Sequence, residues 1–135
     1  MIYLFRHGQT DWNLFKRCNG LTDTFLNHTG IGQAKSQAEN IKNVCFDSCF
    51  CSPLSRARQF CEIIYKGSIT FDRLTEICCG DFEGMEETAE MMRLFWQAIK
   101  SGDKGTECFD TFIKRNCDFC DMIMNQHQRE NILIP

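Results

Sequence analysis

An arginine and a histidine directly follow a short apolar run near the start of the chain. The run is Ile2-Tyr3-Leu4-Phe5, and Arg6-His7-Gly8 comes next. Such a run predicts a buried strand of a parallel sheet, and open α/β sheets bind ligands just beyond the carboxyl ends of their strands. Arginine can hold a phosphate through two parallel hydrogen bonds, and neutral histidine is a nucleophile or base near pH 7. The pair therefore indicates phosphoryl chemistry.

Two further side chains suited to this chemistry follow the next predicted strands. Residues 44–51 are predicted as the second strand and lead to Arg56, which is expected in the first turn of a helix. Residues 68–71 are predicted as the third strand and lead to Glu76, in a loop over residues 72–84. Because parallel strands share one carboxyl edge, we expect both side chains to converge with Arg6 and His7 on one site.

Helical periodicity fills the segments between these strands. Residues 8–29 are expected to form a loop with a short helical turn, and a helix follows from Gly30 on the spacing of its apolar residues. The next helix is predicted from Pro53 to Tyr65, with Ser52 as its N-cap.

Two more helices and one strand are expected in the remaining sequence. The helices cover residues 86–100 and 106–125, separated by a glycine-containing break, and the strand covers residues 131–134. The short, fully apolar strand is expected to be covered on both faces. The alternation of strands and helices predicts a three-layer α/β/α sandwich with a mostly parallel sheet, forming one domain over residues 1–135.

Several ordered motifs give the chain a family resemblance. Residues 6–13 read Arg-His-Gly-Gln-Thr-Asp-Trp-Asn, and residues 52–57 read Ser-Pro-Leu-Ser-Arg-Ala. Residues 74–84 read Leu-Thr-Glu-Ile-Cys-Cys-Gly-Asp-Phe-Glu-Gly, and residues 105–107 read Gly-Thr-Glu. Together they resemble the histidine phosphatase superfamily, also called the phosphoglycerate mutase-like family.

The resemblance implies a reaction that needs neither a metal nor another cofactor. It implies that His7 attacks phosphorus and becomes transiently phosphorylated, while Glu76 protonates the leaving alcohol and later activates water. Arg6 and Arg56 bind the phosphate and neutralise its charge, and Asn13 is expected to donate a further hydrogen bond to it.

Glu76 has two rivals nearby in the sequence. Glu83 and Glu87 are also carboxylates of the same stretch, and a carboxylate in a loop is usually only solvated. The position of Glu76 within the pattern Leu-x-Glu-x-x-x-Gly-x-x-Glu-Gly is what favours it.

One family motif is missing from these residues. Family members carry a second histidine, in a Ser-His-Gly sequence directly after the last core strand, where this sequence reaches Pro135. His28 begins a helical stretch, and His127 precedes the last strand, about four residues at ~3.3 Å each from the site. Neither is expected to substitute. We therefore expect a C-terminally incomplete domain of low activity that tends to aggregate or to form a homodimer through uncovered apolar surface.

The composition argues against several partners. The chain has 135 residues and a formal net charge of -3, which argues against a nucleic-acid surface. No apolar stretch reaches the length that spans a bilayer, and the first strand begins at residue 2, which leaves no room for a signal peptide. We expect a cytoplasmic protein with no nucleic-acid or membrane partner.

Ten cysteines are many for a chain of this length. Cys45, Cys49 and Cys51 fall in a predicted strand and Cys61 in a predicted helix, where reduced cysteine acts as a small hydrophobe. Residues 117–120 have the cysteine spacing of half a zinc site, but no second pair completes it. We therefore expect no metal site.

The expected function is hydrolysis of a small-molecule phosphate monoester. The motif around Glu76 resembles the phosphatase branch of the family, which includes α-ribazole phosphatases, more than its mutase branch. A phosphoglycerate mutase-type phosphotransferase is the alternative among enzymes. A non-catalytic module that binds phosphate esters is the alternative from another class, because the second family histidine is missing.

Overall fold

A computed structural model describes residues 1–67 and 69–135 of the chain. Four short parallel strands form one sheet in the order β1-β4-β2-β3. The strands are β1 (Ile2–Leu4), β2 (Ser48–Cys51), β3 (Ile69–Thr70) and β4 (Ile132–Ile134). Ile132 of β4 lies opposite Ile2 on one side and Ser48 on the other. The last strand of the sequence thus lies inside the sheet, as its apolar composition predicts.

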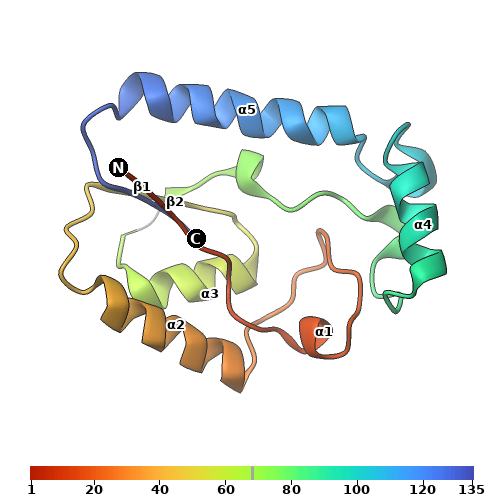
Figure 1. The fold of residues 1–135 in the computed structure, drawn as a ribbon, viewed down its shortest axis with the longest axis horizontal. Helices are drawn as coiled ribbons and strands as arrows, with labels where there is room; N and C mark the ends of the chain where they lie inside the picture. The colour runs from red at the N-terminus through yellow and green to blue at the C-terminus, as the bar shows by residue number, and fades with distance from the viewer. Residues whose placement is uncertain (68) are drawn as a thin grey trace.

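Helices cover both faces of this sheet, so the predicted α/β fold with a parallel sheet is confirmed. Helix α5 lies along one face and helices α2 and α3 along the other, while α1 and α4 lie beyond one end of the sheet (Figure 1). The helices are α1 (Asp11–Leu14), α2 (His28–Ile41), α3 (Ser55–Ile64), α4 (Ala89–Ala98) and α5 (Phe109–Gln126), and the 3-10 turns are η1 (Asp72–Leu74), η2 (Gly80–Phe82) and η3 (Asp103–Gly105).

The alternation of side chains along β2 divides the core between the two faces. Cys49 and Cys51 are buried with Cys61 of α3, whereas Phe50 is buried with Phe119 of α5. This division follows from the pleat, which points successive side chains of a strand to opposite faces. The buried cysteines act as small core hydrophobes, as the sequence predicts, but Cys45 is exposed and precedes the strand.

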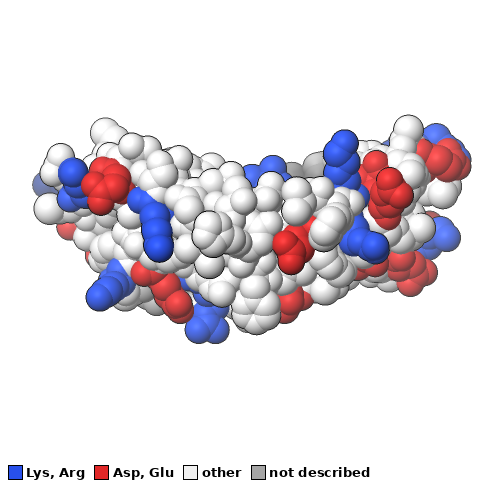
Figure 2. Space-filling model, turned by 90° about the horizontal axis from the view of Figure 1, so that it is seen from below, with Lys and Arg blue, Asp and Glu red and all other residues white. Residues whose placement is uncertain are grey.

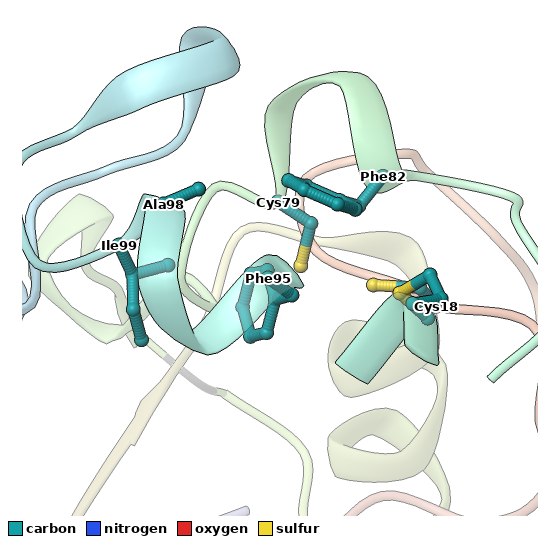
Figure 3. Close-up of a cluster of buried hydrophobic side chains, with 7 residues drawn as sticks. Cys18, Cys79, Phe82, Phe95, Ala98 and Ile99 are labelled. Carbon is teal, nitrogen blue, oxygen red and sulfur yellow. The ribbon is translucent and has the colours of Figure 1, made fainter. Parts of the chain in front are cut away.

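A separate apolar cluster packs around α4, away from the sheet. It includes Phe82 and Phe95, whose ring centroids lie 5.7 Å apart, and the sulfur atoms of Cys18 and Cys79 point toward one another within it (Figure 3). The cluster joins the loop that follows β1, which carries Cys18, to the segment that follows β3, which carries Cys79 and Phe82. It therefore fixes the loops that carry candidate site residues relative to one another.

The surface shows both signs of charge. On the face that carries α2 and α3, basic and acidic side chains are interspersed around an uncharged central area (Figure 2). None of the helices in the described part of the chain combines the length and apolar character that a membrane crossing needs.

The first predicted strand is correct in position but not in burial. Strand β1 lies at the edge of the sheet, and its Ile2 and Leu4 side chains are 52% and 76% exposed. Tyr3 and Phe5 point to the other face and pack against the core. An apolar run predicts a strand, but the strand order decides how many of its faces are covered.

The other predicted elements are present with bounds that differ by a few residues, and α2 begins at His28, two residues before the predicted start at Gly30. The second strand begins at Ser48 rather than residue 44, because the Val44 amide bonds the Ile41 carbonyl at the end of α2. The helices predicted over 86–100 and 106–125 begin three residues later than expected, after Thr88 and Cys108. Of the predicted third strand, residues 69–70 form β3, and Ser68 lies outside the described residues.

The predicted N-cap of α3 is wrong. The helix begins at Ser55, and Leu54 at the capping position makes no side-chain cap bond. Asp23 supplies the acceptors instead, with Oδ1 2.7 Å from the Ser55 amide and Oδ2 2.7 Å from the Ser55 hydroxyl. These hydrogen bonds lower the pKa of Asp23 below its usual value. A loop residue far away in the sequence therefore caps the helix that carries Arg56.

Removing this cap is expected to destabilise the fold. Asp23→Ala should lower the free energy of unfolding by about 1 kcal/mol, the usual cost of losing an N-cap acceptor. Urea denaturation measures the change. Asp121→Ala is the matched control, because Asp121 is exposed on α5, and it should shift stability by less than about 0.5 kcal/mol. Equal effects of the two substitutions would contradict the role of Asp23.

Candidate active site

A cavity of about 430 Å³ opens at the carboxyl end of the sheet. It is lined by the side chains that follow three strands: Arg6 and His7 after β1, Arg56 after β2, and Glu76 after β3. The structure thus brings together four of the five residues that the sequence singles out. The common carboxyl edge of the parallel strands is the physical cause of this placement.

The His7 ring is held in one tautomer by its own backbone neighbour. Its Nδ1 atom lies 2.7 Å from the Gly8 carbonyl oxygen. Because a carbonyl oxygen can only accept, Nδ1 carries the ring proton and donates a hydrogen bond to that oxygen. The Nε2 lone pair is then the atom available for attack. A Cβ atom on Gly8 would lie 2.4 Å from the Gly30 carbonyl oxygen, so only glycine allows this close approach of the loop to α2.

The charge state of His7 also suits a nucleophile. Burial is the largest influence on its pKa and lowers it below the ordinary value of 6.5, and the positive charges of Arg56 and Arg6 lower it further. The hydrogen bond to Gly8 acts in the opposite direction but does not outweigh them. The imidazole is therefore neutral at pH 7, with a lone pair on Nε2.

Arg56 is 3% exposed and is fixed by the loop that precedes α2. Its Nη2 atom donates to the Gly20 carbonyl at 2.8 Å, and Nη1 donates to the Thr22 carbonyl at 3.1 Å and to Asn19 Oδ1 at 3.4 Å. Burial lowers the pKa of Arg56, but a guanidinium remains charged at neutral pH. Three of its five N–H groups make these bonds, which leaves two for an anion in the cavity.

Glu83 holds this loop in place, a role that sequence reasoning missed. Its carboxylate accepts hydrogen bonds from the Leu21 amide at 2.8 Å and from both the amide and the hydroxyl of Thr22. Burial opposes ionisation of Glu83, but these hydrogen bonds outweigh it, and its pKa lies below the ordinary value. Glu83 therefore positions the loop that positions Arg56.

The segment that carries Glu76 is clamped by α5. Arg115 donates to the Arg73 carbonyl at 2.5 Å and to the Glu76 carbonyl at 3.2 Å, and it forms an ion pair of 2.7 Å with Glu107. The Glu76 side chain itself is exposed, and its Oε1 accepts from the Ile77 amide at 2.9 Å. The clamp could not be found from sequence alone, although Glu107 lies in the last family motif.

Asn13 lines a second cavity together with Arg6 and His7, and it does not line the first cavity with Arg56 and Glu76. This second cavity of about 370 Å³ shares Arg6 and His7 with the first and also contains Lys16. Asn13 Oδ1 accepts from both the amide and the hydroxyl of Thr10, each at 3.0 Å, in the capping box of α1. The Nδ2 group is therefore the part of Asn13 that can donate to an anion near His7.

The remaining histidines lie away from the first cavity, as expected. His28 is exposed at the start of α2, and His127 pairs with Glu130 at 2.7 Å near the amino end of β4. Among the described residues that line the first cavity, His7 is the one histidine. Within residues 1–67 and 69–135, no three or more His, Cys, Asp or Glu side chains gather in a way that could hold a metal ion.

Comparison with known proteins identifies the family. The sequence matches the histidine phosphatase superfamily (branch 1) over residues 2–135, and the chain belongs to this family. It is 42% identical over 88 residues to the uncharacterized phosphatase PhoE of Bacillus subtilis (strain 168), covering 62% of this chain and 46% of that protein. It is 30% identical over 148 residues to the adenosylcobalamin/alpha-ribazole phosphatase of Salmonella typhimurium (strain LT2). That match covers 94% of this chain and 73% of the Salmonella protein.

A solved structure shares the same fold. Bacillus stearothermophilus YhfR superposes with a TM-score of 0.82 at 28% sequence identity, covering 98% of this chain and 71% of that chain. The chain spans less than half of the length of the Bacillus subtilis relative that it matches. The family and fold expected from the sequence motifs are therefore confirmed.

Proposed function

We propose that the chain is a metal-independent phosphatase that hydrolyses small-molecule phosphate monoesters through a phosphohistidine at His7. The observation that carries this proposal is the bond from Nδ1 of His7 to the Gly8 carbonyl, which leaves a neutral Nε2 lone pair in a cavity shared with two arginines. Family membership supports the same class of chemistry. The exposed Ile2 of the edge strand supports association of copies as a homodimer.

The proposed reaction has two steps. Nε2 of His7 attacks phosphorus and forms a P–N bond, the ester P–O bond breaks, and Glu76 gives its proton to the leaving alcohol oxygen. Water then attacks phosphorus, the P–N bond breaks, and Glu76 takes the proton of the water, so that inorganic phosphate and the resting enzyme result. Arg6 and Arg56 neutralise charge on the phosphoryl oxygens in both steps, and Asn13 Nδ2 donates to the same group.

The chemistry of the first cavity favours a phosphatase over a mutase. A phosphoglycerate also carries a carboxylate, which needs a cation of its own near the leaving group. Besides His7, the described basic residues that line this cavity are Arg6 and Arg56, and both are assigned to the phosphate. A ligand with a neutral alcohol part fits this cavity better than phosphoglycerate.

Phosphate release and phosphoenzyme trapping test the proposal together. The chain is incubated with phenyl phosphate in the presence of EDTA, and a parallel sample with radiolabelled substrate is quenched in alkali. We expect inorganic phosphate release that EDTA does not reduce, together with an acid-labile, alkali-stable label on the protein. Loss of release in EDTA would overturn the proposal. Saturable binding with neither release nor label indicates a binding module, and label transfer between phosphoglycerates without release indicates a mutase; either result contradicts the phosphatase.

A further inference from the structure

The position of Glu76 determines where the leaving group must lie. A general acid protonates the leaving oxygen only when it is within hydrogen-bond reach of that oxygen. Glu76 lines the first cavity and not the second, while His7 lines both. The alcohol part of the ester must therefore occupy the first cavity, beyond the phosphate.

Apolar residues make up much of the lining of the first cavity. They come from separate parts of the chain and include Leu54, Leu74, Phe112 and Pro135, and the polar residues beside them include the amide of Asn116. Burial of apolar ligand surface against such a wall stabilises the complex, whereas these apolar side chains offer no partner to a charged group. The wall thus fits an alcohol with an apolar body.

Phe112 is the aromatic part of this wall, and its ring is held in place. The Arg115 guanidinium lies 4.8 Å from the ring centroid, and the Phe109 ring is stacked at 6.3 Å with an interplanar angle of 23°. Arg115 is fixed in turn by its ion pair with Glu107. The same clamp therefore holds the Phe112 ring and the backbone of Glu76, so a flat ligand meets a preorganised surface.

Asn116 adds an amide to the wall. One N–H of its Nδ2 group donates to the Phe112 carbonyl at 2.7 Å, which leaves Oδ1 to accept a hydrogen bond and the second N–H to donate one. An acceptor at this place favours an alcohol part that carries an O–H or N–H donor.

We propose that the site selects phosphate monoesters of aryl alcohols, through contact of the aryl ring with Phe112 and a hydrogen bond to Asn116. This substrate class rests on the phosphatase function proposed above. It excludes small anionic esters such as phosphoglycerates as preferred substrates. Phe112 and Asn116 are then the residues that determine specificity.

Binding of non-hydrolysable phosphonates tests this class without requiring turnover. Calorimetry on the 135-residue chain compares benzylphosphonate with methylphosphonate. We expect benzylphosphonate to bind about tenfold more tightly, the gain typical of one aromatic contact. Phe112→Ala should reduce this ratio of affinities to near one, and Phe112→Leu, which keeps the apolar volume, should give an intermediate ratio. Phe25→Ala is the control, because Phe25 is 61% exposed outside this wall and should leave the ratio unchanged.

A second pair of ligands tests the amide. 3-Hydroxybenzylphosphonate should bind more tightly than benzylphosphonate to the natural chain, and Asn116→Leu should remove that advantage. An advantage that persists in Asn116→Leu would contradict the assignment of Asn116.

The possible failures are distinguishable. If neither phosphonate binds, or if Arg56→Met leaves the binding of both unchanged, the phosphate site and the proposed function are wrong. If both ligands bind at this site with equal affinity, or if 3-phosphoglycerate displaces methylphosphonate better than phenyl phosphate does, the aryl preference alone is overturned.

Discussion

His7→Asn is expected to remove the phosphoenzyme label and to lower phosphate release by a factor of ~10³ or more, as loss of a catalytic nucleophile usually does. An asparagine side chain can keep the hydrogen bond from its amide to the Gly8 carbonyl, so the loop is expected to retain its shape. It has no lone pair comparable to that of a neutral imidazole nitrogen, so no P–N bond can form. The effect on chemistry should therefore be large while the fold is preserved.

Two measurements check this prediction. Phosphate release from phenyl phosphate gives the rate, and radiolabelled substrate quenched in alkali gives the covalent label. His28→Asn is the matched control, because His28 is exposed at the start of α2, and it should leave both measurements unchanged. A label that persists in His7→Asn would place the phosphoryl group on another residue and would contradict the proposed mechanism.

Glu76→Gln is expected to have the second largest effect, and the effect should depend on the leaving group. A glutamine can still accept the hydrogen bond of the Ile77 amide, but it cannot supply an acidic proton. Hydrolysis of an alkyl phosphate, whose leaving alkoxide is strongly basic, should slow by ~10²–10⁴, the usual contribution of a positioned general acid. Hydrolysis of p-nitrophenyl phosphate should slow far less, because its phenolate leaves without protonation.

Substitutions of the two nearby carboxylates, Glu83 and Glu87, distinguish the loss of a general acid from other causes of slower hydrolysis. Glu87→Gln is the matched control, because Glu87 is exposed and lines only the second cavity, and it should show no dependence on the leaving group. Glu83→Gln should slow both substrates alike, since Glu83 acts through the loop that holds Arg56. Equal slowing of the alkyl and aryl substrates in Glu76→Gln would argue against its role as the acid.

The sequence by itself determined which residues follow the strands. Arg6 and His7 directly follow Phe5, and Arg56 and Glu76 lie a few residues beyond the next two strands. Because the strands are parallel, all four side chains lie at the same edge of the sheet. These relations are local in the chain, or depend only on the alternation of strands and helices. That is why the family, the fold and the gathering of these four side chains at one cavity could be predicted.

Tertiary structure alone decided the burial of β1 and the capping of α3. The run at residues 2–5 predicts a strand, but its exposure depends on β4 lying on one side of it and no described strand lying on the other. The cap of α3 comes from Asp23 instead of Ser52, because the loop before α2 folds back over the helix start. Neither the neighbours of a strand nor a cap from outside the helix is encoded in a local pattern.

The same reason explains the division of roles between similar side chains. In the sequence, Glu76 and Glu83 are two loop carboxylates seven residues apart, and no spacing rule tells a solvent-accessible acid from a half-buried carboxylate that anchors a loop. The structure separates them, because Glu83 meets the Leu21 and Thr22 amides while Glu76 lines the cavity. Hydrogen bonds between segments that are distant in sequence depend on how the loops pack in three dimensions. Sequence therefore supplies the reactive groups, and packing decides which of them face the ligand.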